Sequence, residues 1–170
     1  MSLGLFTFYS KRRRSQAFTL VEIMVVVVII GLLAAAALPT YRRITMRSKG
    51  TTVVNDLRTF STAFITYNLQ NGRWPADGDP QVVPSEVASQ LPTNFIRRTP
   101  IGGYYKWNFS VPADGITAKA AIIIQAASGN PIIDDLEQIE MIDQLIDDGN
   151  TSTGNLQLGS TNSVVYIIER

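Results

Sequence analysis

The chain of 170 residues contains no cysteine and no histidine. Without cysteine the fold has no disulfide, so it must rely on packing or on a bound ion for its stability. The two absences together exclude Ser-His and Cys-His nucleophile pairs, zinc sites built on thiolate or imidazole, and haem ligation by histidine. The sequence also has no P-loop and no Gly-x-Gly-x-x-Gly pattern. Carboxylate chemistry is the remaining route to catalysis, and we interpret the chain as non-enzymatic.

Charge of either sign is sparse, with 15 Lys and Arg against 14 Asp and Glu. Four of the cations form the run from Lys11 to Arg14, and without that run 11 cations remain. The rest of the chain is therefore mildly acidic. A balance of this kind gives no support for nucleic-acid binding as the main task.

An apolar run of 21 residues, from Phe18 to Leu38, follows the basic leader. About 20 apolar residues are enough for a helix to cross a bilayer. The run contains one acid, Glu22, near its start. An acid costs about 2.5–3.5 kcal/mol at the bilayer centre and less near the end of a span, so Glu22 needs a partner.

A cut between Ala17 and Phe18 would create that partner. The new α-ammonium would lie four residues before Glu22, and two chains side by side could pair ammonium with carboxylate out of water. The acid is then a device for assembly.

The residues Phe-Thr-Leu-Val-Glu from Phe18, with Gly31, Pro39 and Tyr41 after them, resemble the N-terminus of type IV pilins and of the pseudopilins of type II secretion systems. The resemblance covers about residues 11–41. It implies that a prepilin peptidase removes residues 1–17 and methylates the new amine. Ala17 departs from the glycine that is commoner at the end of the leader.

The same resemblance implies that residues 18–41 form the membrane-embedded half of a long helix and later the filament core. Gly31 and Pro39 weaken this half, because glycine raises the entropic cost of helix formation and proline removes a hydrogen bond. A bend is expected there, and the resemblance implies that this stretch can unwind in a filament. Assembly residues are thus Glu22, Gly31 and Pro39.

Two other interpretations start from the same segment. An ordinary secretory signal would be cut after the alanines 35–37, and an uncut segment would be a plain membrane anchor. Either would make the chain a cell-envelope binding protein. Both are less favoured, because the run is longer than the about 7–15 residues of a signal peptide and Glu22 is out of place in one.

The orientation in the membrane follows from the size of the C-terminal part. Cations lie on both sides of the apolar run, at residues 11–14 and 42–49, so their count decides nothing. A large region after the span is translocated largely regardless of charge. We expect a single-pass inner-membrane protein with its head outside the cytoplasm, which then enters a periplasmic or cell-surface filament.

The resemblance also implies the partners. These are other copies of the chain and related pilins, the prepilin peptidase, and an inner-membrane assembly platform with a separate ATPase.

After Pro39 the pattern remains helical, and it predicts one helix from about Phe18 to Leu69. Its second half, residues 42–70, has an apolar stripe that we expect to pack on the head. The stripe consists of Val53, Leu57, Phe60, Phe64 and Tyr67.

The globular head, residues 71–170, is predicted as a small antiparallel sheet with short helices, which makes the fold class α+β and pilin-like. A surface loop is expected over 74–84 and a short helix over about 85–90. Strands are expected at Tyr104–Val111, Thr117–Gln125 and Val164–Ile168, the first two joined by a turn at 112–115. A second helix is predicted with Asn130 as N-cap and Pro131 in its first turn.

An acidic segment after this second helix is the candidate metal site. Asp147, Asp148 and Asn150 offer oxygen ligands of the kind that Ca²⁺ takes, although the spacing is not that of an EF-hand. The competing interpretation is a helix end with Asx-type turns. No other cofactor is expected.

Overall fold

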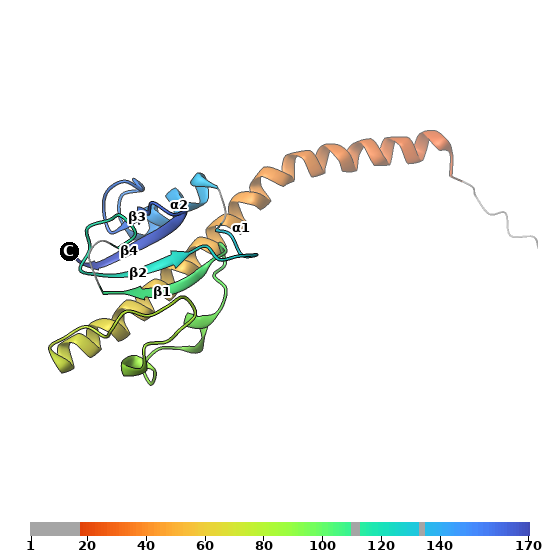
Figure 1. Ribbon diagram of the computed structural model, residues 1–170. Helices are drawn as coiled ribbons and strands as arrows, with labels where there is room; N and C mark the ends of the chain where they lie inside the picture. The colour runs from red at the N-terminus through yellow and green to blue at the C-terminus, as the bar shows by residue number, and fades with distance from the viewer. Residues whose placement is uncertain (1–17, 110–112, 133–134) are drawn as a thin grey trace, which may run out of the picture. The chain divides into compact units, whose positions relative to one another are not determined.

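The computed structural model describes residues 18–109, 113–132 and 135–170. The chain divides into two compact units, one ending at Tyr41 and the other running from Arg42 to Arg170. Helix α1 (Leu20–Asn71) passes through both units without a break (Figure 1). The predicted helix thus extends two residues further at its C-terminal end, where the αL conformation of Gly72 stops it.

The head contains a four-stranded antiparallel sheet with the strand order β1-β2-β4-β3. The α+β class predicted from the sequence is therefore confirmed. The strands are β1 (Tyr104–Asn108), β2 (Ala120–Gln125), β3 (Leu156–Leu158) and β4 (Ser163–Glu169). The sequence patterns did not predict β3.

One face of the sheet packs on the second half of α1. All five residues of the predicted stripe are buried, which confirms its place in the core. The Phe64 ring stacks on Trp107 of β1, with centroids 3.8 Å apart, and Phe60 meets Tyr105 edge to face at 4.9 Å. The Trp74 ring is tilted against Trp107, with centroids 5.5 Å apart. Such aromatic pairs add about 0.5–1.5 kcal/mol each beyond the burial of their area.

The opposite face of the sheet has a smaller apolar cluster of its own. It includes Ile123 of β2 and Val165 of β4, together with Ala113 and Ala118 from the connection between β1 and β2. The predicted turn in that connection is present as a tight turn over 113–116, while Pro112 lies outside the described residues. This connection therefore covers the sheet as well as joining two strands.

Asp114 fastens the same connection to the loop between β3 and β4. Its carboxylate accepts hydrogen bonds from the hydroxyls of Ser160 (3.1 Å), Thr161 (2.8 Å) and Ser163. Burial raises the pKa of Asp114, but these hydrogen bonds outweigh burial and hold it below the usual value.

The segment predicted as a surface loop over 74–84 lies along the outer edge of β1. The Gly78 amide donates to the Trp107 carbonyl (3.2 Å) and the Gln81 amide to the Tyr105 carbonyl (3.3 Å). A sheet edge needs such cover, because its free amides and carbonyls would pair with other chains. The helix predicted after it is a single 3₁₀ turn, η1 (Ser85–Val87), and a second one, η2 (Thr93–Ile96), was not predicted.

The predicted start of the second helix was wrong. Helix α2 spans Leu136–Ile146, and its N-cap is Asp135 rather than Asn130. Asn130 is buried in a tight turn with Ala127, and its side-chain amide donates to the Gly103 carbonyl at 3.1 Å. An asparagine directly before a proline is typical of an N-cap, but the side chain of Asn130 bonds to a distant loop.

Helix α2 packs against α1 at Gly50. A Cβ atom at Gly50 would lie only 3.2 Å from Ile142, so glycine allows the close approach. The Gln138 side chain donates to the Met46 carbonyl of α1 at 2.9 Å. The Arg58 guanidinium donates to the Leu145 carbonyl at 3.2 Å, which places a cation at the negative end of α2.

Candidate functional site

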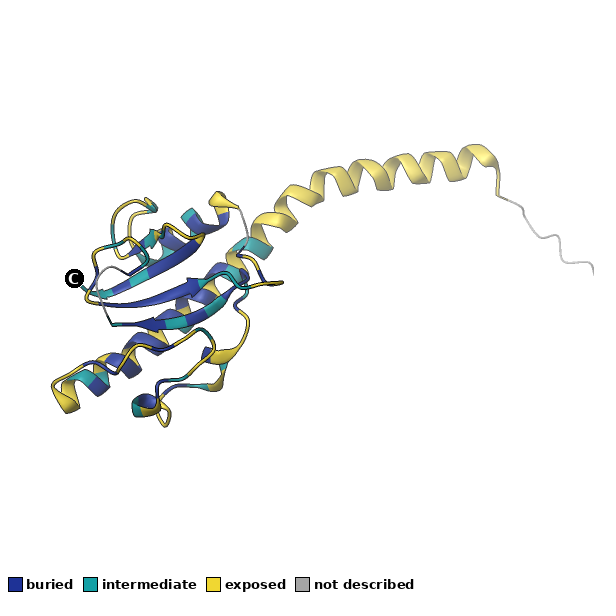
Figure 2. Cartoon of the chain, in the orientation of Figure 1, coloured by how far each residue is buried: buried dark blue, intermediate teal, exposed yellow. Residues whose placement is uncertain are grey.

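The first half of α1 has no buried residue from Phe18 to Ile44, as the uniform yellow of Figure 2 shows. Its large apolar side chains are exposed on every side of the helix. By length and composition this helix can cross a membrane. An exposed apolar surface of this extent marks a membrane or protein partner.

The start of α1 is built around Thr19 and Glu22. The Thr19 hydroxyl accepts a hydrogen bond from the Glu22 amide at 3.2 Å and so caps the helix. Glu22 lies in the first turn, where the helix dipole favours a negative charge. The residue is exposed, so its carboxylate is open to a partner from outside the chain. Ala17, the residue before the predicted cut, lies outside the described residues.

Gly31 and Pro39 lie within the unbroken part of α1. A Cβ at Gly31 would meet nothing within 4 Å, so no contact with the described residues requires glycine there. The role of both residues in assembly stays a prediction.

The acidic segment after α2 brings three carboxylates together. One oxygen each of Asp143, Asp147 and Asp148 lies within 4.8 Å of the other two. The sequence prediction named Asp147 and Asp148 but missed Asp143, which α2 contributes. A signal was available, because Asp143 follows the buried Ile139 by four residues and so shares its helix face.

The predicted Asx turns are present in the same segment. The Asn150 amide donates to Asp148 Oδ1 at 3.0 Å, and the Ser152 amide donates to Asn150 Oδ1 at 3.1 Å. The carboxamide oxygen of Asn150 therefore already has a hydrogen-bond partner. The Asn155 amide donates to Asp147 Oδ2, which fixes the loop just before β3.

The side chain of Asp143 is inaccessible to solvent. Among the described residues its carboxylate oxygens have no partner with regular hydrogen-bond geometry, but the Asp147 carboxyl and the Gly149 amide lie close to them. Burial, then the Asp147 carboxyl and the charge of Asp148, raise the pKa of Asp143 to about 7, and the nearby Gly149 amide opposes this only weakly. Burial also raises the pKa of Asp147, but the carboxyl of Asp143 and the amides of Asn155 and Asp148 outweigh it and lower the pKa. Asp143 and Asp147 are thus suited to hold one proton or one cation between their two carboxyl groups.

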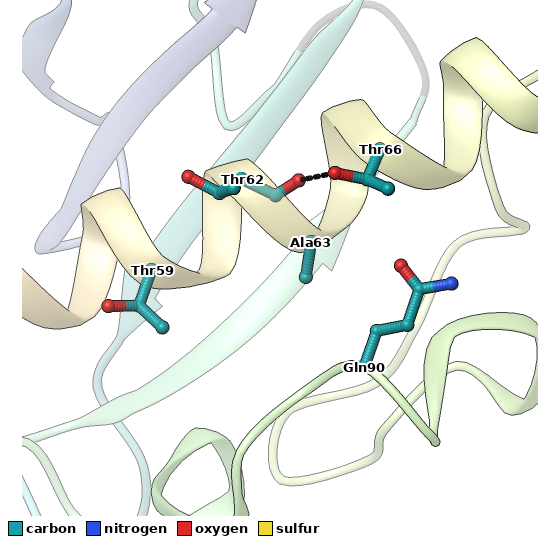
Figure 3. Close-up of a pocket in the computed structure, with 5 residues that line it drawn as sticks. All are labelled: Thr59, Thr62, Ala63, Thr66 and Gln90. Atoms are coloured by element: carbon teal, nitrogen blue, oxygen red, sulfur yellow. Dashed lines mark hydrogen bonds between the residues drawn. The ribbon is translucent and has the colours of Figure 1, made fainter.

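A shallow groove of about 470 Å³ runs along the exposed side of α1 in the head (Figure 3). Its threonine hydroxyls bond to carbonyls of their own helix, as Thr66 does to Thr62 at 2.7 Å and Thr59 to Asn55 at 2.8 Å. With these donors satisfied, the groove offers mostly methyl groups and the Gln90 side chain. The groove therefore gives no support for the alternative interpretation, in which the chain is a binding protein of the cell envelope.

Comparison with known proteins points to the N-terminal segment. The model of the prokaryotic N-terminal methylation motif matches residues 12–38. The type II secretion system core protein G of Pseudomonas aeruginosa is 34% identical over 87 residues, which is 50% of this chain and 61% of that protein. Protein G of Klebsiella pneumoniae is 34% identical over 94 residues, or 55% and 66% of the two chains.

Type IV pilins are similar to this chain over a shorter stretch of sequence, and one of them is also similar in fold. The type IV major pilin PilE1 of Neisseria gonorrhoeae is 38% identical over 60 residues, covering 35% of this chain and 36% of the pilin. The chain thus spans less than two thirds of the length of these curated relatives.

The solved structure of the major type IV pilin PilA1 from Clostridium difficile superposes with a TM-score of 0.53 at 17% identity, covering 74% of this chain and 97% of that one. At this identity the likeness shows the fold alone. The predicted resemblance is confirmed: the chain carries the prokaryotic N-terminal methylation motif, is similar to type IV pilins and pseudopilins, and has a pilin-like fold.

Proposed function

We propose that the chain is a structural subunit of a type IV pilus or of a pseudopilus-like filament. One observation carries the proposal: the segment that matches the methylation motif, residues 12–38, continues into a helix with no buried residue up to Ile44. A helix that is apolar all round and is not covered by the described residues of its own chain needs lipid or other helices around it. The subunit acts by assembly and not by catalysis.

The proposed sequence of events uses the same surface twice. The helix first spans the inner membrane as a single pass, with the head outside the cytoplasm. A prepilin peptidase cuts before Phe18 and methylates the new amine. An assembly platform with a separate ATPase then moves the helix from lipid into a bundle of copies and related pilins, which forms a periplasmic or cell-surface filament.

Glu22 makes the transfer of the helix from lipid to the bundle energetically favourable. In lipid an unpaired carboxylate is unfavourable, whereas in the bundle it meets the α-ammonium of Phe18 on a neighbouring subunit. The assembled state therefore relieves a cost that the membrane state imposes.

Co-expression with a prepilin peptidase tests the processing step. Intact-mass measurement should show the loss of 17 residues and one added methyl group on Phe18, and Ala17→Leu should block the cut. The matched control Ala37→Leu should be processed as the parent is. A mature chain that begins at Leu38 would instead identify an ordinary signal peptide and remove the proposal.

Glu22→Ala tests the assembly step. The variant should reach the membrane fraction as well as the parent, because a charge has been removed, yet electron micrographs should show no filaments. Glu137→Ala, which changes an exposed acid in the head, should leave filaments unchanged. Normal filaments from Glu22→Ala would show that the charge pair does not drive assembly.

A further inference from the structure

A small polar pocket lies on the face of the sheet that is turned away from α1. Its volume is about 220 Å³, and it is lined by Lys106 and Asn108 of β1, Ile123 and Gln125 of β2, and Asp114 from the connection between the two strands. Sites for drug-sized ligands have volumes of about 300–1,000 Å³, so this pocket suits a smaller molecule or a single unit of a longer chain. None of its residues takes part in the proposed filament assembly.

The strand register explains why these side chains meet. Tyr105 and Trp107 of β1 pack on the aromatic rings of α1, so the residues that alternate with them face the other way. Lys106 is one of these residues and lies opposite Ile123 of β2. Gln125 follows two residues later on the same face of β2. An ammonium group and a carboxamide are therefore held side by side over an apolar floor.

These two polar groups have no partner within the described part of the chain. The single ion pair among the described residues joins Lys119 to Glu169, so the Lys106 ammonium is not paired with an acid. The Gln125 side chain makes no hydrogen bond to the described residues. Both side chains are half-buried, where water can satisfy them only in part. Their donors are thus available to a ligand that accepts from both.

Asp114 forms another wall of the pocket, but its carboxylate is already occupied. It accepts hydrogen bonds from the hydroxyls of Ser160, Thr161 and Ser163 and from the Thr161 amide at 3.3 Å. A carboxylate has about four acceptor positions, so these donors compensate its charge within the chain. An amine or an amino acid would need free acceptors for its ammonium group. Asp114 therefore shapes the pocket and does not favour a cationic ligand.

The free groups of the pocket select the chemical class of the ligand. A carboxylate accepts at once from an ammonium group and from the N–H groups of a carboxamide. The carboxamide oxygen of Gln125 accepts in turn, so a hydroxyl group beside the ligand's carboxylate is bound as well. Ile123 offers contact to C–H groups. A uronic acid has all of these parts on one sugar ring.

We propose that this pocket binds a uronic acid, either as the free sugar acid or as one unit of an acidic polysaccharide. The carboxylate of the sugar accepts hydrogen bonds from Lys106 and Gln125. A sugar hydroxyl donates to the carboxamide oxygen of Gln125, and the ring lies over Ile123. The head then has a binding site on its side, separate from the helix that assembles.

A row of residues beside the pocket provides room for a longer chain. Arg98 lies opposite Tyr104 of β1, and Tyr104 lies opposite Gln125 of β2, so the three side chains share one face. Arg98 is exposed and supplies a second cation. In a polysaccharide of uronic acids, the carboxylate of the next unit would pair with this guanidinium.

The test uses the full-length chain in a detergent without a sugar headgroup. Calorimetric titration with sodium glucuronate and with sodium galacturonate should show one site per chain, and raising the salt concentration should weaken binding. Glucose lacks the carboxylate and acetate lacks the hydroxyls, so each should bind at least about tenfold more weakly than the better uronate. No binding of either uronate would overturn the proposal, and so would equally tight binding of glycine.

Lys106→Gln tests the cation that would hold the carboxylate. The variant should bind the uronate at least about tenfold more weakly, because a charged hydrogen bond is lost. The matched control Lys119→Gln removes a cation that is already paired with Glu169, and it should bind as the parent does. Parental affinity in Lys106→Gln would overturn the proposal.

Gln125→Glu decides the question if Lys106→Gln does not fold, as judged by circular dichroism. The new side chain has nearly the same shape but places a negative charge against the carboxylate of the sugar. Binding should again weaken at least about tenfold. Parental affinity in Gln125→Glu would count against the site.

Trigalacturonate distinguishes the two sources of the ligand. If the site binds a polysaccharide, the trimer should bind at least about tenfold more tightly than the monomer, and Arg98→Gln should remove this gain. Equal affinities for monomer and trimer would assign the site to the free sugar acid. All of these measurements use the unassembled chain, so this proposal and the proposed filament function fail or succeed separately.

Discussion

The two halves of α1 are parts of one continuous helix, yet they differ completely in what covers them. From Phe18 to Ile44 no residue is buried, whereas nine residues between Gly50 and Tyr67 are buried. The first half is apolar all round, and the second has a stripe with threonine and charged residues on its other side. The difference teaches that the same backbone conformation can serve two partners: the sheet of its own chain, and surfaces that its own chain does not supply.

The source of stability differs accordingly. Full burial of a large apolar side chain contributes about 1.5–3 kcal/mol, so the stripe of the second half fixes the helix on the head. The first half obtains no such contribution from the described residues of its own chain. In the proposed function, its free energy is set by lipid or by neighbouring subunits, so the helix can be transferred from one to the other.

Removal of residues 1–41 should produce the largest change. It takes away the uncovered apolar surface and leaves the unit from Arg42 to Arg170, including the Met46 carbonyl that Gln138 contacts. The fragment should be a soluble monomer with cooperative thermal unfolding. Size-exclusion chromatography and calorimetry measure this. Aggregation of the fragment would mean that the first half also shields apolar surface of the head, and the contrast between the two halves would be lost.

Phe64→Ala should have the next largest effect, confined to the second half. The ring is fully buried and stacks on Trp107, so its loss should destabilise the head by about 3–5 kcal/mol in denaturant unfolding. Thr62→Ala, on the exposed side of the same helix, should change the free energy of unfolding by no more than about 0.5 kcal/mol. Similar losses in the two variants would contradict the assignment of the stripe to the core.

Asp114→Asn should give the smallest effect and should depend on pH. The hydrogen bonds to the ionised carboxylate lower its pKa in the folded head, so they stabilise the head above the unfolded value near 3.8 and this stability is lost as the pH falls below it. The variant should lose about 1–3 kcal/mol at neutral pH. Its difference from the parent should shrink between pH 4 and pH 2. A difference independent of pH would show that the charge of Asp114 is irrelevant.

The sequence predicted best where one pattern extends over many residues. The spacing of Val53, Leu57, Phe60, Phe64 and Tyr67 repeats over four turns, so its helix and its buried face follow directly from periodicity. Tyr105 and Trp107 of β1 are two residues apart and both buried, so the buried face of this strand also follows from its period of two. Strand boundaries were predicted less accurately, since β2 begins at Ala120 rather than Thr117.

Short and non-local features could not be predicted in the same way. β3 has only three residues, too few for alternation to be recognised, and it exists because β4 offers it an edge. Asn130 is a plausible cap by type, but its partner Gly103 is 27 residues away. Asp143 was missed because the predicted metal site was drawn only from residues after the helix, although its place four residues after Ile139 indicates the buried face of α2.

The two tryptophans of the chain, Trp74 and Trp107, give the head a spectroscopic label of its own. Both are largely buried, and their indole N–H groups donate to Glu169 at 2.6 Å and to the Pro75 carbonyl at 3.2 Å. The apolar half of α1 has no tryptophan. Intrinsic fluorescence should therefore report on the head alone. Its emission maximum should stay the same in detergent, in lipid and in an assembled filament, and should move to longer wavelength only when the head unfolds.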